Sequence, residues 1–481
     1  MLDVKPVILY TDVVLWALLA VVLLYVWHVR REPGLAAKWR RVLADRTAVA
    51  SGALLCVFFL VALADSVHWR AALPGADASG AVVYDTRTVS LLDAVVGSRI
   101  AGRERSYSAP FALREFDKTT VIENGVPVRD FQRLAGAGAD FTEDEADARL
   151  ARQGALGLFC GLAAAGGFLA ACGLIGALGR RKALQTADAE PGAKAGLLDG
   201  MRRTLSRANP WRPALFVWAG VLLAAVLLAF VWPERHVLGT DTTGNDVLYS
   251  ALKSIRTAVA IGSLATLSTL PFAVTLGIAA GYFRGWVDDL VQYVYTTISS
   301  IPSVLLIAAS ALMIQVFIDK NPALYETGLE RADMRLFSLA CIIGLTGWAS
   351  LARLLRAETM KTAAADYVSA ARAFGVPALG IMLRHILPNV AHVVLIVAVL
   401  DFSGIVLYEA VLSYVGVGVD PVMESFGSMI NAAAAEMSRS PVIWWNLLAS
   451  LAFMLALVLS ANLFASGVRD AFDPRAARRA G

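Results

Sequence analysis

The sequence predicts an all-α polytopic membrane protein with about nine transmembrane helices. Of its 481 residues, 57% are hydrophobic and only 17% are charged, and the mean hydropathy is +0.61. Soluble domains are less apolar and carry more charge. The net charge of +4 is too small to favour nucleic-acid binding, and the positive residues cluster in short loops, as in proteins oriented in a membrane.

Nine mainly apolar runs are each long enough to span a bilayer, which takes roughly 17 to 25 residues in a helix. They occupy residues 7–28, 48–64, 154–178, 213–232, 257–282, 290–317, 336–352, 390–409 and 444–466. The first run is expected to stay as a helix rather than to be removed as a signal peptide. It is long, Arg30 and Arg31 follow it, and no A-x-A cleavage site is present.

No pattern in the sequence indicates a metal site or a catalytic residue. The cysteines lie in apolar runs without a CxxC pair and are interpreted as small buried apolar residues: Cys56, Cys160, Cys172 and Cys341. None of the five histidines is spaced from a cysteine or carboxylate as a metal ligand or triad member. A G-x-x-x-x-G-K-[ST] loop is also absent, so we expect no ATP hydrolysis by this chain.

Lysine and arginine predict the orientation of the chain. The segments 30–41 and 180–212 are short and basic, which places both in the cytoplasm. The N-terminus is then outside, and nine spans put the C-terminus in the cytoplasm. We divide the chain into two transmembrane helices (1–64), an outer insertion lobe (65–152), a third transmembrane helix (153–179), a basic cytoplasmic linker (180–212) and a six-helix core (213–481).

The insertion lobe is predicted to be a small α/β unit. AVVYDTRTVSLL alternates like a strand, and ENGVP at 123–127 is a turn signal. Thr142 and Glu145 have capping-box spacing, and the pattern continues without a breaker into the third span, so one helix is expected to run from the lobe into the membrane. QTADAEPGAKAG at 185–196 has no periodicity and is typical of a flexible linker.

A loop at 353–389 separates the fourth and fifth spans of the six-helix core and is cytoplasmic by parity. Its apolar residues recur at i, i+3, i+4 and i+7 on one face of a short helix: Tyr367, Ala370, Ala371 and Phe374. Gly375 suits the left-handed end of that helix, Pro377 suits the first turn of the next, and Pro388 interrupts hydrogen bonding before the next span. Residues 366–389 of this loop are predicted to form a stiff elbow.

Two interpretations of the elbow remain open on amphipathicity alone. One is a surface helix that lies among lipid headgroups. The other is a docking surface, because alanines followed by a glycine turn and a proline let a groove of another protein close on the backbone. We favour docking, since a lipid-facing helix would carry large apolar residues.

The elbow resembles the EAA loop of ABC-importer permeases, whose pattern is E-A-A, three residues, G, nine residues, I, any residue, L-P. Ala370, Ala371, Gly375, Leu387 and Pro388 are in register with it. Two positions differ from the pattern, Ser369 at the glutamate and His385 at the isoleucine, and RHILPN is similar to the peptide-transporter branch. The neighbouring Asp366 is a candidate to replace the missing glutamate.

Three further stretches resemble C-type permeases of the oligopeptide, dipeptide and nickel family. They are HVLGTDTTGND (236–246), where Asn245 replaces an arginine, AGYFRGWVDD (280–289) and YEAVLSYVGVGV (408–419). The resemblance covers roughly residues 200–481, and WRRVLADRTAVASGALL matches the family's N-terminal lead-in more weakly. Residues 1–29 and the lobe fall outside the pattern.

The resemblance implies a permease subunit of an ATP-driven importer in the bacterial inner membrane, most consistent with peptide transport. It would pair with a second homologous permease, two cytoplasmic ATPase subunits that bind ATP and Mg, and a periplasmic solute-binding protein. The residues implied to couple to the ATPase are Tyr367, Ala370, Ala371, Phe374, Gly375, Leu387 and Pro388. This chain would hold no cofactor or metal and would contact lipid.

The outer motif GTDTTGND has two interpretations. It is either a turn in which Asp241 or Thr243 caps an interfacial helix, or a contact for a docked binding protein. Its candidate residues are Gly239, Thr240, Asp241, Gly244 and Asp246.

Asp401 is the strongest candidate for the translocation path, because a carboxylate within a membrane span faces the bundle interior or water by default. Pairing purely for packing is the alternative. Gln315 is a weaker polar candidate, and Pro302 is expected to kink the span at 290–317.

Two other classes of protein remain open. A secondary transporter or channel would use Asp401 without ATPases, and would predict inverted repeats and several intramembrane charges, neither of which is evident. A membrane-anchored sensor would act through the lobe at 65–152, and would leave six spans without a purpose.

Overall fold

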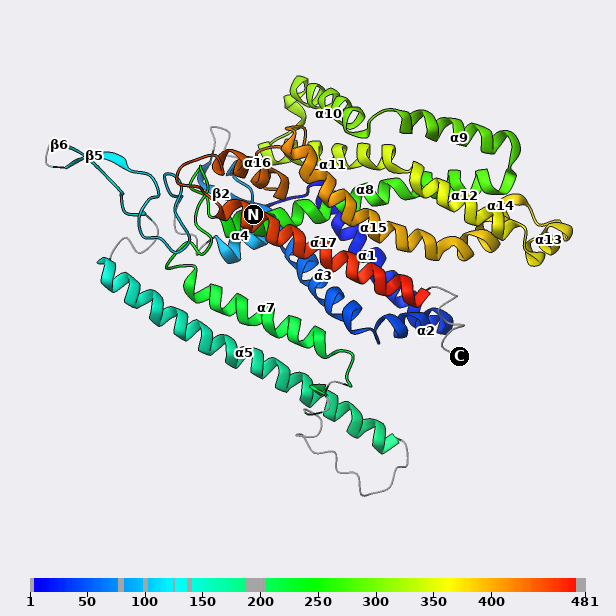
Figure 1. Ribbon diagram of the computed structural model, residues 1–481, viewed down its shortest axis with the longest axis horizontal. Coiled ribbons are helices and arrows are strands. Elements are labelled where there is room, and N and C mark those ends of the chain that lie inside the picture. The colour runs from blue at the N-terminus through cyan, green and yellow to red at the C-terminus, as the bar shows by residue number, and fades with distance from the viewer. Residues whose placement is uncertain are drawn as a thin grey trace.

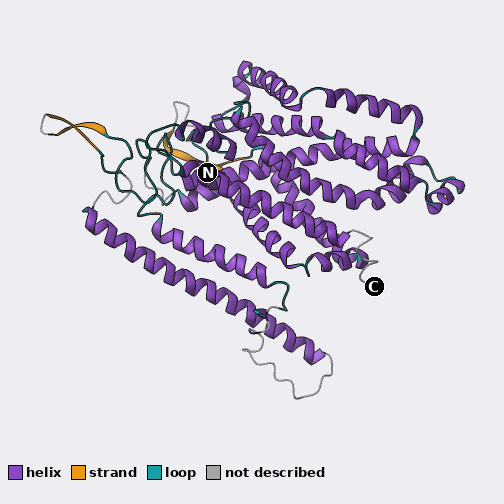
Figure 2. Ribbon diagram, viewed as in Figure 1, coloured by secondary structure: helices purple, strands orange, loops and turns teal. Residues whose placement is uncertain are grey.

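The computed structural model describes residues 4–76, 82–97, 103–123, 126–135, 141–186, 202, 204–206 and 208–472. Within this described part, eight helices are long and apolar enough to cross a membrane, and a bent helix pair makes nine. The predicted all-α membrane fold is therefore confirmed. Most helices lie along the long axis of the molecule, and the described strands gather at one end of it (Figures 1 and 2).

The long helices correspond to the apolar runs of the sequence. They are α1 (Tyr10–Arg31), α3 (Arg46–Asp65), α5 (Glu143–Thr186), α7 (Arg212–Val231), α8 (Val247–Phe283), α10 (Ser303–Lys320), α11 (Gly328–Gly347), α12 (Ala349–Ala363), α15 (Leu387–Tyr414) and α17 (Trp445–Phe472). The pair α11 and α12 is bent by 41° and forms the ninth candidate span. Shorter helices are α2 (Pro33–Val42), α4 (Leu91–Val96), α9 (Gly285–Ser300), α13 (Asp366–Ala373), α14 (Ala378–Ile381) and α16 (Phe426–Glu436).

The helix expected over 290–317 is broken rather than kinked. α9 ends at Ser300, Ile301 has extended backbone dihedrals, and α10 begins at Ser303, directly after Pro302. The tertiary amide of proline supplies no N–H, so the helical hydrogen-bond ladder is interrupted there.

The lobe contains the small α/β structure expected outside the membrane. Its strands are β2 (His68–Ala76), β3 (Val82–Tyr84), β4 (Val89–Ser90), β5 (Thr119–Glu123) and β6 (Val126–Asp130). β5 and β6 pair antiparallel around the predicted turn, of which residues 124–125 lie outside the described residues. Thr142 and Glu145 contact each other through a 3.1 Å hydrogen bond at the start of α5, which confirms one helix from the lobe into the bilayer-length span.

The segment before α1 contains a short strand, whose last residue, Val7, was predicted to begin the first membrane span. Val4–Val7 forms β1, which pairs antiparallel with β2, and Val7 lies opposite His68. The lobe is thus completed by the N-terminal end of the described chain. Of the predicted linker 180–212, α5 extends to Thr186, while residues 187–201, 203 and 207 lie outside the described part.

The helix α1 is attached to α8 and α11 by buried charges. Arg256 of α8 is only 3% exposed, and its Nη2 lies 2.6 Å from Asp12 of α1 and 3.7 Å from Asp333 of α11. Thr11 donates a short hydrogen bond to Asp333, and His68 of β2 lies 2.9 Å from the second Asp12 oxygen. This polar cluster joins α1, α8, α11 and the lobe.

The helices α3 and α7 have different neighbours. α3 contacts α8 and α17, whereas the main contacts of α7 are with α5 and α3. Gly157 and Gly161 of α5 face Leu227 and Leu223 of α7, and a β-carbon at Gly161 would lie 2.7 Å from Leu223. Small residues four apart let membrane helices approach closely. α5 and α7 thus form a separate hairpin beside the other helices (Figure 1). The division of the chain at residue 213 stays a prediction.

Candidate coupling elbow and outer motif

The elbow, residues 366–389, lies at the opposite end of the molecule from the lobe (Figure 1). It consists of α13, a glycine turn, α14, a π-helical turn over Met382–Ile386 and the first residues of α15. Gly375 has φ of +75°, as expected for the left-handed end of a helix, and the Val376 amide donates to the Ala371 carbonyl. Pro377 precedes α14, and Pro388 lies in the first turn of α15. The sequence pattern therefore has its expected backbone form.

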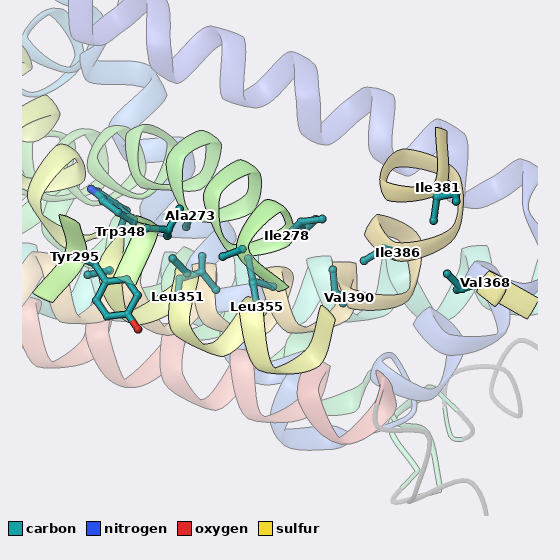
Figure 3. Close-up of a cluster of buried hydrophobic side chains, with 14 of the residues drawn as sticks. Ala273, Ile278, Tyr295, Trp348, Leu351, Leu355, Val368, Ile381, Ile386 and Val390 are labelled. Carbon is teal, nitrogen blue, oxygen red and sulfur yellow. The ribbon is translucent and has the colours of Figure 1, made fainter. Parts of the chain in front are cut away.

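One side of the elbow is anchored in a hydrophobic cluster. Val368 is fully buried, and Ile381 and Ile386 are buried beside Leu355 of α12 and Val390 of α15. Figure 3 shows these side chains arriving from separate elements and gathering around α12. Because burial of each such side chain is worth roughly 1.5 to 3 kcal/mol, the cluster holds the elbow against α12 and α8.

The opposite side of the elbow is an exposed apolar surface. Phe374 is 87% exposed, and Tyr367, Leu379 and Leu383 are also exposed. The four residues predicted to share one apolar face therefore do not pack inward together: Ala371 alone is buried, at 9% exposure, while Tyr367, Ala370 and Phe374 face outward. The physical reason is that Val368 and Ala371 occupy the inward side of this short helix.

Polar contacts fix the ends of the elbow. Asn389 Nδ2 donates to the Tyr367 hydroxyl at 2.8 Å and to the His385 carbonyl at 2.7 Å, which ties α13 to α15. Leu387 is half-buried and Pro388 is exposed. Asp366 and Ser369 are both exposed, so a carboxylate lies one turn before the position where the EAA pattern has its glutamate.

The elbow is connected to α8 through close helix packing. A β-carbon at Gly281 of α8 would lie 2.7 Å from the Arg356 carbonyl and from Thr359 Cβ, and one at Gly277 would lie 2.9 Å from Leu355 Cβ. Arg356 also forms a bidentate ion pair with Asp288 of α9, with both contacts at 2.5 Å. The α12 helix that leads into the elbow is therefore held on two sides.

The outer motif 239–246 is a folded bridge between the lobe and α8. The Thr240 hydroxyl donates to the Ser106 carbonyl at 2.8 Å and accepts from the Ser108 amide at 2.7 Å. Trp445 Nε1 donates to the Thr240 carbonyl at 3.0 Å. Gly239 and Gly244 have positive φ, and a β-carbon at Gly244 would lie 1.9 Å from the Glu104 carbonyl oxygen. Only glycine fits where the two backbones meet.

The helix cap in this motif is Asp246, and the expectation that Asp241 or Thr243 would cap the helix was wrong. Asp246 Oδ1 accepts the Tyr249 amide at 3.0 Å at the start of α8. Asp241 instead accepts from the amides of Thr243 and Asn245 and shapes the loop itself. The cap lies five residues after Asp241 and three after Thr243, because the loop closes on itself before the helix begins.

The pKa of His236, which lies beside this cap, is strongly shifted. Burial alone would lower its pKa, but hydrogen bonds with Asp246 at 2.8 Å and Glu104 at 3.4 Å oppose that effect. The carboxylates outweigh the burial and raise the pKa of His236 to about 9. His236 is therefore a cation at neutral pH that joins the lobe to the motif, a role that its isolated position in the sequence did not indicate.

The three candidates for the translocation path lie in different places. Asp401 is half-buried in α15 and takes part in none of the hydrogen bonds or ion pairs among the described residues. Gln315 is half-buried in α10, and Pro302 is exposed at the break before α10. Tyr408, two turns along from Asp401, donates to the Ser303 hydroxyl at 3.2 Å, so α15 lies beside that break. No hydrogen bond joins Asp401 to Gln315 in the described part.

The chain is similar to known membrane transport proteins. Residues 273–478, which include the elbow, match the family model of the binding-protein-dependent transport system inner membrane component. The oligopeptide transport system permease protein OppC of Mycobacterium tuberculosis is 31% identical over 240 residues, which cover 50% of this chain and 76% of that protein.

Two further relatives are named for other substrates. The dipeptide transport system permease protein DppC of Lactococcus lactis is 30% identical over 243 residues, covering 50% of this chain and 65% of that protein. The glutathione transport system permease protein GsiD of Pectobacterium atrosepticum is 28% identical over 243 residues, covering 50% of this chain and 73% of that protein.

The fold and the matches define a multi-pass inner-membrane transport permease. The chain belongs to the binding-protein-dependent transport system inner membrane component family. About half of the chain lies outside the aligned regions.

Proposed function

We propose that this chain is the C-type permease subunit of an ATP-driven importer for peptides, and that it forms half of the translocation pathway. The family match and the relatives named for oligopeptides, dipeptides and glutathione support the substrate class. The pathway would be completed by a second homologous permease, and the solute would be delivered by a periplasmic binding protein.

The observation that carries the proposal is the two-sided elbow. Its inner side is buried against α12 and α8, and its outer side exposes Phe374, Tyr367, Leu379 and Leu383. An exposed apolar surface on a rigid support is suited to a protein groove. In this proposal two ATPase subunits, which bind ATP and Mg, press on the elbow, and the motion passes through α12 and the Gly277 and Gly281 contacts to α8.

The proposed orientation puts the elbow and the C-terminus in the cytoplasm and the lobe and N-terminus in the periplasm. The basic segments 30–41 and 180–212 support it. The placement of the lobe and the elbow at opposite ends of the long axis is consistent with it (Figure 1). ATP hydrolysis would belong to the partner subunits, since this sequence has no phosphate-binding loop.

The experiment that tests the proposal compares Phe374→Ala with Phe159→Ala. Phe159 lies in α5 and is also largely exposed, so the second variant removes the same ring far from the elbow. We expect Phe374→Ala to reduce both co-purification of the ATPase subunits and ATP-dependent peptide uptake, because an aromatic anchor that becomes buried at an interface typically contributes about 2 kcal/mol or more. Phe159→Ala should leave both unchanged.

The importer proposal would be rejected if no ATPase co-purified with the wild-type chain. It would also fail if uptake continued after ATP depletion, as expected for the secondary transporter or channel that uses Asp401. Deletion of the lobe that abolished function while ATPase binding persisted would favour the sensor interpretation.

A further inference from the structure

A cavity of about 410 Å³ lies at the lobe end of the molecule, between the lobe and the start of α8. One wall comes from the lobe segment 86–93 and the other from the first turns of α8, with the loop before α16 closing a side. The volume is within the range of sites for small molecules, about 300 to 1,000 Å³. Because one wall comes from the lobe, the cavity depends on the lobe.

Most charges in the cavity wall are already neutralised within the protein. Lys253 Nζ lies 2.9 Å from Asp93 and 3.9 Å from Asp65. Arg256 is paired with Asp12 and lies near Asp333, as described above. A ligand would gain little from these groups, since their partners already satisfy them.

Two opposite charges in the wall have no ion-pair partner. Arg87 and Glu424 both line the cavity, and neither takes part in any salt bridge among the described residues. Burial raises the pKa of Glu424, with the nearby Asp241 carboxylate adding to the effect and only Lys253 and the Ser250 hydroxyl opposing it. A cation brought to Glu424 would therefore stabilise its ionised form.

A neutral polar group in the same wall is also unused. The Thr88 hydroxyl is buried and forms no hydrogen bond within the described structure. Asn245, from the outer motif, lines the cavity opposite the lobe segment. The wall thus offers one acceptor for a cation, one donor for an anion and uncharged hydrogen-bonding groups.

We propose that this cavity binds a small zwitterion of the size of a short peptide, with its ammonium group at Glu424 and its carboxylate at Arg87. A guanidinium binds a carboxylate through two parallel hydrogen bonds, and a buried carboxylate is a strong acceptor for an ammonium group. The inference deepens the proposed function, because it gives a peptide its first contact with the permease on the outer side.

The test measures binding of trialanine to the full-length chain in phosphatidylcholine nanodiscs by titration calorimetry. Trialanine is expected to bind, and both N-acetyl-trialanine and trialanine amide should bind at least about tenfold more weakly, because each loses one charge-assisted contact. Glu424→Gln should bind trialanine and N-acetyl-trialanine with equal affinity. Arg87→Gln should bind trialanine and trialanine amide with equal affinity. The matched controls Asp319→Asn and Arg331→Gln change exposed charges outside the cavity and should bind like wild type.

Equal affinity for the free and blocked peptides, or no binding at all, would overturn the inference. A zwitterionic lipid headgroup has the same chemistry, so the titration is repeated with phosphatidylethanolamine in the nanodiscs. Loss of trialanine binding there would assign the cavity to lipid and overturn the peptide assignment. No ATPase is present in this assay, so its failure is distinct from a failure of the importer proposal, which is judged by ATPase co-purification.

Discussion

At the scale of the residue, the outer motif depends on the single carboxylate of Asp246. It caps α8 through the Tyr249 amide, accepts from Trp232 Nε1 at 3.0 Å and lies 2.8 Å from His236. The carboxylate is 2% exposed, so each of these contacts replaces a water molecule that it has lost. Asp246 thereby joins the end of α7, the motif and α8.

His236 predicts how the stability of this region changes with pH. Its folded-state pKa is raised to about 9 from 6.5 in the unfolded chain, so the stabilisation is complete below about pH 6.5 and is lost as pH rises through about 9. The effect is of the order of 3 kcal/mol. We expect His236→Gln to abolish most of the fall in melting temperature between pH 6.5 and 9.5, measured by tryptophan fluorescence.

The control for this prediction is His28→Gln, which changes an exposed histidine at the far end of α1. It should keep the wild-type pH dependence. An unchanged pH profile in His236→Gln would show that the His236 cation does not stabilise the outer motif.

Substitution of Asp401 is predicted to affect transport without lowering the stability of the fold. Because the carboxylate has no partner among the described residues, Asp401→Asn removes an unpaired charge and should leave the free energy of unfolding unchanged or higher. If the residue lies on the pathway, uptake should fall although folding is intact. Thermal unfolding and uptake are measured on the same preparation. A clear loss of stability would favour the packing role instead.

At the scale of the element, α8 joins the outer motif to the elbow. Its 37 residues extend about 55 Å, from the Asp246 cap to Gly281 beside α12. Both ends are attached to the parts that would meet the binding protein and the ATPase in the proposed function. α8 therefore mechanically connects the two ends of the molecule.

The packing of α8 on α12 predicts the effect of added volume. Gly281→Val should lower the free energy of unfolding by about 1 to 3 kcal/mol, because its β-carbon would lie 2.7 Å from Thr359 Cβ and from the Arg356 carbonyl. Gly166→Val in α5 is the matched control, because an added β-carbon there would have no neighbouring atom from another part of the described chain within 4 Å. Thermal unfolding and ATPase stimulation are both measured. Equal stability of the two variants would contradict the tight contact.

The elements differ in how well the sequence predicts them. The apolar runs are visible because a membrane helix must be apolar along its whole length. The elbow follows from Gly375 and Pro388, which act locally on the backbone. The inward role of Val368 was missed, because an eight-residue helix offers too few turns to tell which of two apolar sides is buried. Asp246 was not predicted as the cap, because the sequence does not show where the preceding loop ends and α8 begins.

At the scale of the whole molecule, the charge cluster at Arg256 holds α1 against α8 and α11. Arg256→Gln should cost about 3 to 5 kcal/mol, because it removes the guanidinium that pairs with the buried carboxylates of Asp12 and Asp333. The double variant with Asp12→Asn should recover part of that loss. Thermal unfolding measures both, and equal values for the single and double variants would contradict direct coupling of the two residues.

The global arrangement of the helices was harder to predict than their number. Both α3 and α7 are preceded by basic residues and follow a similar pattern, yet α3 contacts α8 and α17 while α7 packs mainly on α5 and α3. Hydropathy identifies membrane helices but does not indicate which helices are neighbours. Packing between helices in lipid depends on small residues such as Gly157 and Gly161. The pairing of β1 with β2 could likewise not be predicted from the sequence, since a strand of four residues is too short to show a clear alternation.

The strand β1 has a consequence for the synthesis of the protein. Val7 leaves the ribosome about sixty residues before its partner His68, and α1 and α3 lie between them. Both helices must therefore have been inserted, in opposite directions, before the first rung of the sheet can close. Correct insertion of the first two membrane helices is thus a precondition for folding outside the membrane, and a chain with a misplaced first helix would leave β2 without its edge partner.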